Sequence, residues 1–250
     1  MMLKQIIKTI LPAGTWEKLK ERKNNFVISQ VCRLAPGFIF LDGWDKRKKY
    51  IVEQSEYFSQ ANQDHFLDNF IFDRKQNGFF LDIGGNDPIK INNTYFFEKY
   101  RNWNGLAFEP MSELNSKWKL SRKTECLQVA LGDENSQVEF CQYENDYMSG
   151  FSDDVDYNGK IKKTYKVQVK KLSDVLAERK IFHVDFMSLD VEGAELKVLN
   201  GLDFSKFKID YIVMENDKGI QKENILRNFM WDKGYKLIAR LWLDDVWTNL

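Results

Sequence analysis

The sequence predicts an α/β protein built on a mostly parallel sheet, and two observations lead to this prediction. Short apolar runs, at residues 79–83 and 186–189, have the composition of strands that are buried on both faces. Segments with apolar residues at helical spacing separate these runs, and such alternation is typical of βαβ units. We therefore expect five strands alternating with helices, followed by an antiparallel hairpin at the C-terminal end.

The expected elements follow one another at short intervals. The first helix follows residues 59–64, and Ser59 or Asn62 could cap it. Further helices are expected to start near residue 95 and to cover residues 112–120, 172–178, 194–199 and 220–233. Strands are expected at residues 79–83, 105–108, 125–132, 136–143, 165–170, 186–189, 209–215, 235–241 and 246–250, the last two joined around Asp244 and Asp245.

Charge divides the chain into two regions. The 37 basic and 37 acidic side chains cancel, which argues against a nucleic-acid-binding protein. Residues 1–55, however, hold eleven Lys or Arg against five Asp or Glu, a balance of +6. We expect residues 1–55 to be a basic, partly helical appendage and residues 56–250 to be one domain. The appendage could contact an anionic membrane surface or a partner, although a solvated face is the commoner explanation.

The cysteines and the N-terminus bear on the compartment. Cys32, Cys126 and Cys141 are far apart and form no C-x-x-C pair, so neither a disulfide framework nor a thiolate zinc site is indicated. Lys8 interrupts the first apolar segment, which argues against a signal peptide. No apolar run reaches the roughly 18 residues of a membrane span. We expect a soluble, cytoplasmic protein, and the sequence gives no indication of its oligomeric state.

The turn after the first strand is a candidate ligand site. Asp82 ends the strand, and Gly84, Gly85 and Asn86 follow. In open α/β sheets, ligands bind at such carboxyl ends of strands. The stretch does not match the G-x-G-x-x-G dinucleotide fingerprint, and no phosphate-binding loop is present. Asp82 and Asp87 would also repel phosphate groups.

A second acidic residue ends the next strand. Glu109 precedes Pro110 and lies 23 residues after Asn86. A right-handed crossover would place its carboxylate beside the first turn, where it can accept hydrogen bonds from a ribose diol. An idle surface glutamate is the alternative. An acid-lined turn suits a ligand with a cationic amino-acid end and a ribose, and S-adenosylmethionine is such a ligand.

A second group of acids follows two later strands. These candidates for a general base are Asp190 and Glu192 first, then Glu215 and Asp217. Clustered carboxylates raise one another's pKa, which makes one of them a better base. As alternatives to the role of general base, Asp190 could bind the cofactor, and Glu192 could serve merely as a helix cap. We expect Glu195 to be a solvated helix residue. We predict no metal, although four acids could also hold a divalent cation.

Several segments together resemble the FkbM-type family of S-adenosylmethionine-dependent methyltransferases. The matching segments are residues 59–64, 80–88, 103–110 and 186–195 and the tail from Gly234, in the order that the family has them. Residues 1–55 have no counterpart. The resemblance implies a Rossmann-like class I methyltransferase fold, with a mostly parallel seven-stranded sheet that ends in an antiparallel hairpin.

The resemblance also implies site residues and an activity. The residues that match the cofactor motifs are Asp82, Gly84, Asn86 and Glu109, together with Gly85 and Pro110 beside them; alanine is more usual at position 85. Asp190, Glu192 and Gly193 match the acidic motif, and Val129 and Ala130 would border the adenine. The implied reaction is O-methylation of a hydroxyl on a sugar, glycan or secondary metabolite, by in-line displacement.

Two other functions compete with this one. A non-catalytic adaptor could keep the cofactor fold and use its basic arm for a partner or an anionic surface. A nucleotide-dependent oxidoreductase is disfavoured because the glycine pattern fails. We expect the acceptor pocket to be built from residues 144–164, with Ser149 and Ser152 as possible contacts and the N-terminal appendage as a second candidate contributor. We expect His65 and His183 to be structural.

Overall fold

The computed structural model describes residues 39–40, 57–152, 159–217 and 219–250. The chain divides into two units, residues 1–40 and 41–250. Of the predicted appendage at residues 1–55, only the strand β1 (Ile39–Phe40) is described; the rest, and the predicted boundary at residue 55, lie outside the described residues. None of the described helices is both long and apolar enough to cross a membrane.

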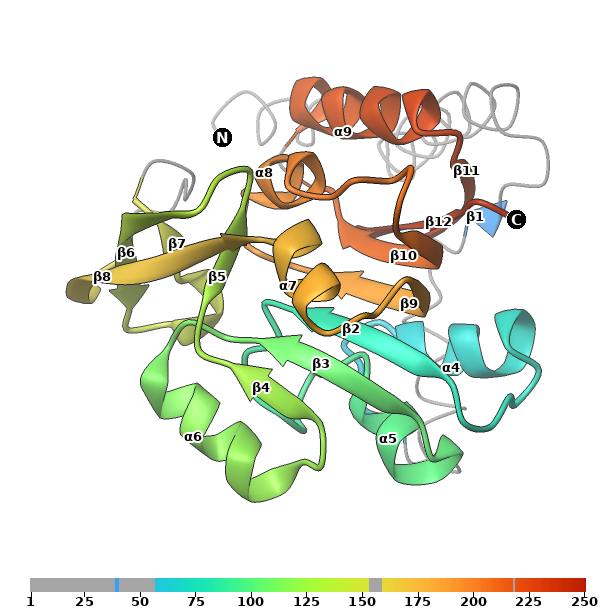
Figure 1. The fold of residues 1–250 in the computed structure, drawn as a ribbon, viewed down its shortest axis with the longest axis horizontal. Helices are drawn as coiled ribbons and strands as arrows, with labels where there is room; N and C mark the ends of the chain where they lie inside the picture. Colours follow the sequence, from blue (N-terminus) through green and yellow to red (C-terminus); the bar gives the residue numbers. More distant parts are fainter. Residues whose placement is uncertain (1–38, 41–56, 153–158, 218) are drawn as a thin grey trace, which may run out of the picture. The chain divides into compact units, whose positions relative to one another are not determined.

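Seven strands from residues 57–250 lie in one sheet, in the order β11-β12-β10-β9-β2-β3-β4 (Figure 1). The five strands β4, β3, β2, β9 and β10 are mutually parallel, whereas β12 is antiparallel to both β10 and β11. These strands are β2 (Phe79–Ile83), β3 (Asn104–Phe108), β4 (Glu125–Leu127), β9 (His183–Leu189), β10 (Lys208–Glu215), β11 (Lys236–Leu241) and β12 (Asp244–Thr248). The predicted fold class, with its C-terminal hairpin, is confirmed.

The apolar runs form strands because both faces of the central sheet are covered. Every residue of β9 after His183 is buried, and the last four residues of β2 are buried as well. Phe80, Phe97, Trp103 and Phe186 meet in one aromatic core, with Phe97 only 5.1 Å from Phe186 between ring centroids. Such rings remove a large apolar area from water, which drives the sheet and its helices together.

The helices are close to their predicted positions. They are α4 (Gln63–Phe66), α5 (Tyr95–Arg101), α6 (Ser112–Ser121), α7 (Leu172–Glu178), α8 (Glu195–Asn200) and α9 (Ile220–Asp232). A π-helical turn, Leu67–Ile71, continues α4. The predicted side-chain cap on α4 is confirmed for Ser59 and wrong for Asn62. Asn62 precedes the helix without making a cap bond, whereas Ser59 Oγ accepts a hydrogen bond from the backbone amide of Asp64, in the first turn, at 3.3 Å and also donates to the buried carboxylate of Asp64.

The sequence did not predict a second, separate sheet. Its four strands lie in the order β5-β8-β6-β7 (Figure 1). They are β5 (Ala130–Gly132), β6 (Ser136–Tyr143), β7 (Gly150–Phe151) and β8 (Ile161–Lys171). The single strand predicted over residues 125–132 is therefore two strands, β4 and β5, which belong to different sheets. The change of sheet occurs at Gln128 and Val129, between β4 and β5.

The structure corrects one boundary in the hairpin. Asp244 and Asp245 belong to β12, so the hairpin turns at Trp242 and Leu243 instead. This correction does not change the sheet order.

Two of the three cysteines are described. Cys126 and Cys141 are buried and free, whereas Cys32 lies outside the described residues.

The position of the candidate site follows from the strand order. From β2 the chain proceeds to β3 and β4 on one side, and it later adds β9 and β10 on the other side. The order therefore reverses between β2 and β9. In sheets of this kind, the crevice at the carboxyl ends of the two central strands is the usual ligand site.

Candidate functional site

One cavity of about 430 Å³ lies at this edge of the sheet. Its volume falls within the range of small-molecule sites, roughly 300–1,000 Å³. The segments after β2, β3, β9 and β10 all contribute to its wall because parallel strands bring their carboxyl ends to one edge. Lining residues among the sequence predictions are Asp82, Gly84, Gly85, Asn86, Glu109, Pro110, Val129, Ala130, Ser149, Asp190, Glu192, Glu215 and Asp217. The sequence thus identified residues from every strand end of the cavity.

Close packing explains the two glycines after β2. Gly84 has φ +79°, and a Cβ there would lie 1.8 Å from the carbonyl oxygen of Asp190. At Gly85 a Cβ would lie 2.6 Å from both Asp82 Oδ1 and the Trp118 ring. The alanine that is more usual at position 85 would therefore require a shift in this chain. Both glycines are therefore required by the close packing of this turn against the rest of the protein.

Asp82 holds the turn from inside. It is only 3% exposed, and it accepts hydrogen bonds from Asn92 Nδ2 at 3.0 Å and from Thr94 Oγ1 at 2.5 Å. Burial raises its pKa, while these hydrogen bonds and the nearby Arg122 act in the opposite direction. Asp82 therefore has a structural task in addition to its place on the cavity wall.

Arg122 and Trp118 fix the same loop, and sequence reasoning missed both. The buried guanidinium of Arg122 donates to the Pro88 carbonyl at 2.8 Å and pairs with Glu98 at 2.9 Å. It also lies 4.5 Å from the Trp118 ring, whose Nε1 donates to the carbonyl of Asn86 at 2.9 Å. Nothing in the local sequence of α6 indicates this role, because the partners are about 30 residues away along the chain.

Glu109 joins the ends of β2 and β3. Its Oε2 accepts a hydrogen bond from the backbone amide of Asn86 at 3.1 Å, and its Oε1 accepts one from the backbone amide of Met111 at 2.8 Å. The residue is 2% exposed, and burial raises the pKa of its carboxyl group to about 7. The crossover therefore brings Glu109 beside the first turn, as predicted. A carboxylate has capacity for further hydrogen bonds beyond these two.

A segment of the second sheet closes the other side of the cavity. Residues 145–151 line it, and they include the 3₁₀ turn Asp146–Met148. Asn86 Nδ2 donates to the carbonyl of Asp146 at 3.2 Å, which ties this segment to the turn after β2. Ser149 lines the cavity and accepts from the Tyr143 amide, whereas Ser152 is not among the lining residues. Part of the predicted acceptor segment, residues 153–158, lies outside the described residues.

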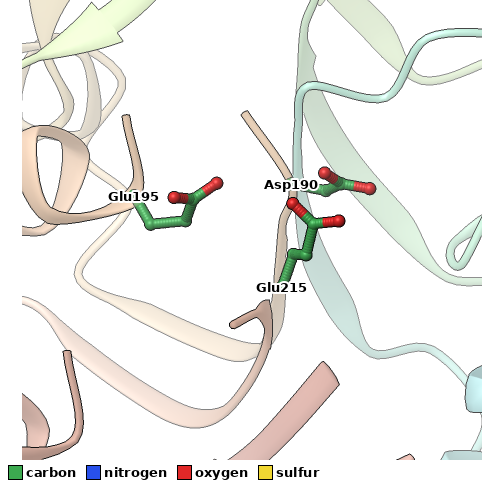
Figure 2. A group of neighbouring side chains, drawn as sticks. All are labelled: Asp190, Glu195 and Glu215. Atoms are coloured by element: carbon green, nitrogen blue, oxygen red, sulfur yellow. The ribbon is translucent and has the colours of Figure 1, made fainter. Parts of the chain in front are cut away.

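The acids after β9 and β10 form one cluster. Oxygens of Asp190, Glu195 and Glu215 lie within 4.8 Å of one another. Figure 2 shows Asp190 next to Glu215, with Glu195 reaching towards them from α8. Asp190 lies on the cavity wall, and its side chain is exposed. Burial, and then the charge of Glu215, raise its pKa well above the usual range. Oxygen ligands in this arrangement also suit a divalent cation, so that alternative stays open.

The prediction for Glu195 is wrong. Its side chain is 2% exposed, and Oε1 accepts hydrogen bonds from the amides of Val191 at 3.2 Å and Gly193 at 3.1 Å. Glu195 thus reaches back over the segment between β9 and α8. The residue before α8 is Ala194, which offers no side-chain cap. Glu192 lies on the cavity wall with φ 56°, a conformation in which residues other than glycine are strained.

The hairpin contributes residues that sequence reasoning also missed. Asp244 stands opposite Glu215 in the sheet and accepts a hydrogen bond from Gln63, and burial raises its pKa to about 7. The fully buried Asp245 accepts from Arg227 Nε at 2.9 Å and Arg240 at 2.8 Å. These contacts hold the start of β12 against α9, β11 and α4 beside the acidic cluster. Gln60, in the polar stretch before α4, lines the cavity as well.

The two histidines lie away from the cavity. His183 begins β9, at the opposite end of the strand from Asp190, and its Nε2 lies 2.8 Å from Asp210. His65 packs edge-on against Tyr57 at 4.7 Å, and burial lowers its pKa. Neither is a lining residue, in accord with the expected structural role of both.

The fold and the cavity define an α/β domain of the Rossmann-like methyltransferase type, with its ligand cavity where the strand order reverses. Residues 82–237 match the family described as "Methyltransferase FkbM domain", and the chain belongs to this methyltransferase family.

Two known proteins resemble the chain in part. "Methyltransferase 1" of Beauveria bassiana (strain ARSEF 2860) is 33% identical over 162 residues, which are 55% of this chain and 64% of that protein. The chain thus matches less than two thirds of that relative's length. A crystal structure of methyltransferase FkbM from Methylobacillus flagellatus KT has a TM-score of 0.41 and 11% identity, over 69% of this chain and 43% of the other.

Proposed function

We propose that the chain is an S-adenosylmethionine-dependent O-methyltransferase that acts on a hydroxyl of a sugar, glycan or secondary metabolite. One observation carries the proposal. A single cavity joins the glycine turn after β2 and Glu109 to the acids after β9 and β10. A methyl donor and a hydroxyl acceptor must meet in one enclosed space, because holding two reactants in line supplies much of the acceleration.

The residues around the first turn fit the proposed donor. Gly84 and Gly85 line the cavity, and glycine allows a ligand to approach the backbone closely. Glu109 can accept hydrogen bonds from a ribose diol, and Ala130 offers an apolar surface for an adenine. The carboxylates of the wall favour the ammonium and sulfonium charges of the donor. When bound, S-adenosylmethionine supplies an electrophilic methyl group.

The acids at the other end of the cavity are candidates for the general base. A hydroxyl is a poor nucleophile, so a positioned carboxylate should take its proton as the oxygen attacks. Asp190 is accessible from the cavity and has a raised pKa, which increases its basicity. Glu215 and Glu192 are the other candidates on the wall. Asp190 could serve both as base and as a ligand for the methionine end of the donor.

Titration calorimetry with S-adenosylmethionine, S-adenosylhomocysteine and NAD tests the donor. We expect the first two to bind and NAD to fail, and we expect Glu109→Ala to weaken donor binding. Binding of NAD alone would contradict the methyltransferase proposal and favour an oxidoreductase. Unchanged affinity in Glu109→Ala would remove the ribose role of this residue.

Turnover separates the enzyme from the adaptor. The protein is incubated with a cell extract and a donor that carries an isotopically labelled methyl group, and the products are analysed by mass spectrometry. Labelled small molecules or glycans support the enzyme. Donor binding without any labelled product would favour the non-catalytic adaptor.

A further inference from the structure

The charge of the cavity wall restricts the acceptor. We propose that the cavity takes an uncharged polyhydroxyl acceptor and excludes hydroxyl compounds that carry a phosphate, sulfate or carboxylate near the methylated oxygen. The inference rests on the proposed function, and it adds a chemical class to the acceptor.

Carboxyl groups dominate the ionisable groups of the wall. The acids that line the cavity are Asp82, Glu109, Asp146, Asp190, Glu192, Glu215 and Asp217. Among the lining residues that the structure describes, none is lysine, arginine or histidine. An anionic group on the acceptor would therefore meet the ionised carboxylates among these acids, and none of the described lining residues would offer it a basic partner. Such repulsion is stronger in a cavity, where burial limits screening by water, than on an open surface.

Three arginines behind the wall, Arg122, Arg227 and Arg240, already have buried partners. Arg227 and Arg240 both bind Asp245, and Arg240 also donates to the carbonyl of Asn216 at 2.9 Å. Arg122 is held by Glu98 and by the loop after β2. Turning any of them towards the cavity would break buried charged hydrogen bonds, which are costly to lose. These arginines are therefore poor candidates for binding an acceptor anion.

The remaining groups of the wall suit hydroxyls. Gln60 and Asn93 carry amides, and Asn93 Nδ2 donates to Ser188 Oγ at 3.0 Å on the same wall. A hydroxyl both donates and accepts, so carboxylates, amides and a serine can all bind it. These neutral amide donors and carboxylate acceptors can together bind several hydroxyls of an acceptor molecule that carries no anionic group.

Apolar side chains complete the surface for a polyhydroxyl ring. Ile91 and Tyr147 line the cavity and are 48% and 42% exposed, respectively. Ile91 has φ 54°, a strained conformation for a β-branched residue, and such strain occurs most often at functional sites. A ring with C–H groups on its faces and hydroxyls on its edge can pack on these side chains.

Fractionation by charge tests the inference. A cell extract is passed over an anion exchanger, and the retained and unretained fractions are each incubated with the full-length protein and isotopically labelled S-adenosylmethionine. We expect at least tenfold more labelled product in the unretained fraction, which corresponds to ~1.4 kcal/mol of discrimination. Label that appears mainly in the retained, anionic fraction would overturn the inference.

Anion binding gives a second test that needs no turnover. Inorganic phosphate and D-glucuronate are titrated into protein saturated with S-adenosylhomocysteine, and the side-chain amide signals of Gln60, Asn86 and Asn93 are followed by NMR. We expect no saturable shift with a Kd below ~10 mM. A saturable shift with either anion would overturn the inference. If S-adenosylhomocysteine itself does not bind, the proposed function fails, and the same titration of the free protein still decides the charge of the wall.

Discussion

The backbone amide of Asn86 donates a hydrogen bond of 3.1 Å to the carboxylate of Glu109, across the ends of β2 and β3. Glu109 is almost fully buried at this point, and the pKa of its carboxyl group rises to about 7. The same group that would bind a ribose thus also fixes the turn beneath it. Its protonation state consequently affects folding and would also affect the proposed binding of a ribose.

The stability of the fold should decrease as pH rises, because the pKa of Glu109 is raised in the folded protein. The unfolded chain releases this proton near the ordinary pKa of 4.5, whereas the folded chain keeps it up to about 7. The folded state therefore binds more protons in between, and its stability decreases as pH rises through this window. At ~1.4 kcal/mol per unit of pKa, the contribution is about 3 kcal/mol.

The variant Glu109→Gln cannot ionise, so it should gain about 3 kcal/mol relative to the wild type between pH 4.5 and pH 7.5. Urea unfolding at several pH values measures this difference. The exposed Glu134 provides the control, because Glu134→Gln should shift the curve little at any pH. A difference between wild type and Glu109→Gln that is constant with pH would contradict the prediction.

Thr94→Val should destabilise the loop after β2. The substitution keeps the shape of the side chain but removes a hydrogen bond to the buried Asp82. A bond to a charged buried group contributes about 1.5–3 kcal/mol, and we expect a loss in that range. Thermal or urea unfolding provides the measurement. Thr164→Val, on the exposed face of β8, should change stability by less than about 0.5 kcal/mol; equal losses in the two variants would contradict this account.

Gly84→Ala should disrupt the cavity more than backbone strain alone explains. Both Gly84 and Gly234 have positive φ. A Cβ at Gly84 would lie 1.8 Å from the carbonyl oxygen of Asp190, whereas a Cβ at Gly234 would meet no neighbouring atom within 4 Å. Gly234→Ala should therefore show only the backbone cost of about 1–3 kcal/mol. We expect Gly84→Ala to lose more stability than this and also to lose affinity for S-adenosylhomocysteine by calorimetry. Comparable effects in the two variants would argue against the close approach.

Asp190→Asn should remove turnover. Loss of a general base lowers rates by about 10²–10⁴-fold, and asparagine preserves the size of the side chain. Single-turnover assays with labelled donor, on the acceptor found in the extract, measure the effect. The control is again Glu134→Gln, which should retain wild-type turnover. If Asp190→Asn remains fully active, the base is another acid of the cluster, and Glu215→Gln is the next variant to assay.

Local pattern was sufficient for most elements. Helix α7 has the predicted bounds, residues 172–178, and β6 has the predicted bounds, residues 136–143. The segment at residues 125–132 failed, because an apolar run contains no signal for leaving one sheet and joining another. Glu195 failed for a related reason. Its position in a helix favours solvent, but the segment between β9 and α8 folds over it and offers two amides.

The sequence by itself determined the parallel sheet, the C-terminal hairpin and the acids and glycines at the strand ends, because hydrophobic periodicity and turn residues act over a few neighbours. Only the tertiary structure decided that Arg122 holds the loop after β2 and that Asp245 binds Arg227 and Arg240. It also decided that residues 145–151 close the cavity. Apart from the contact of Asp245 with Arg240, which lies within the hairpin, these contacts join segments that are far apart along the chain. The free energy of burying each charged group depends on partners that no local pattern specifies.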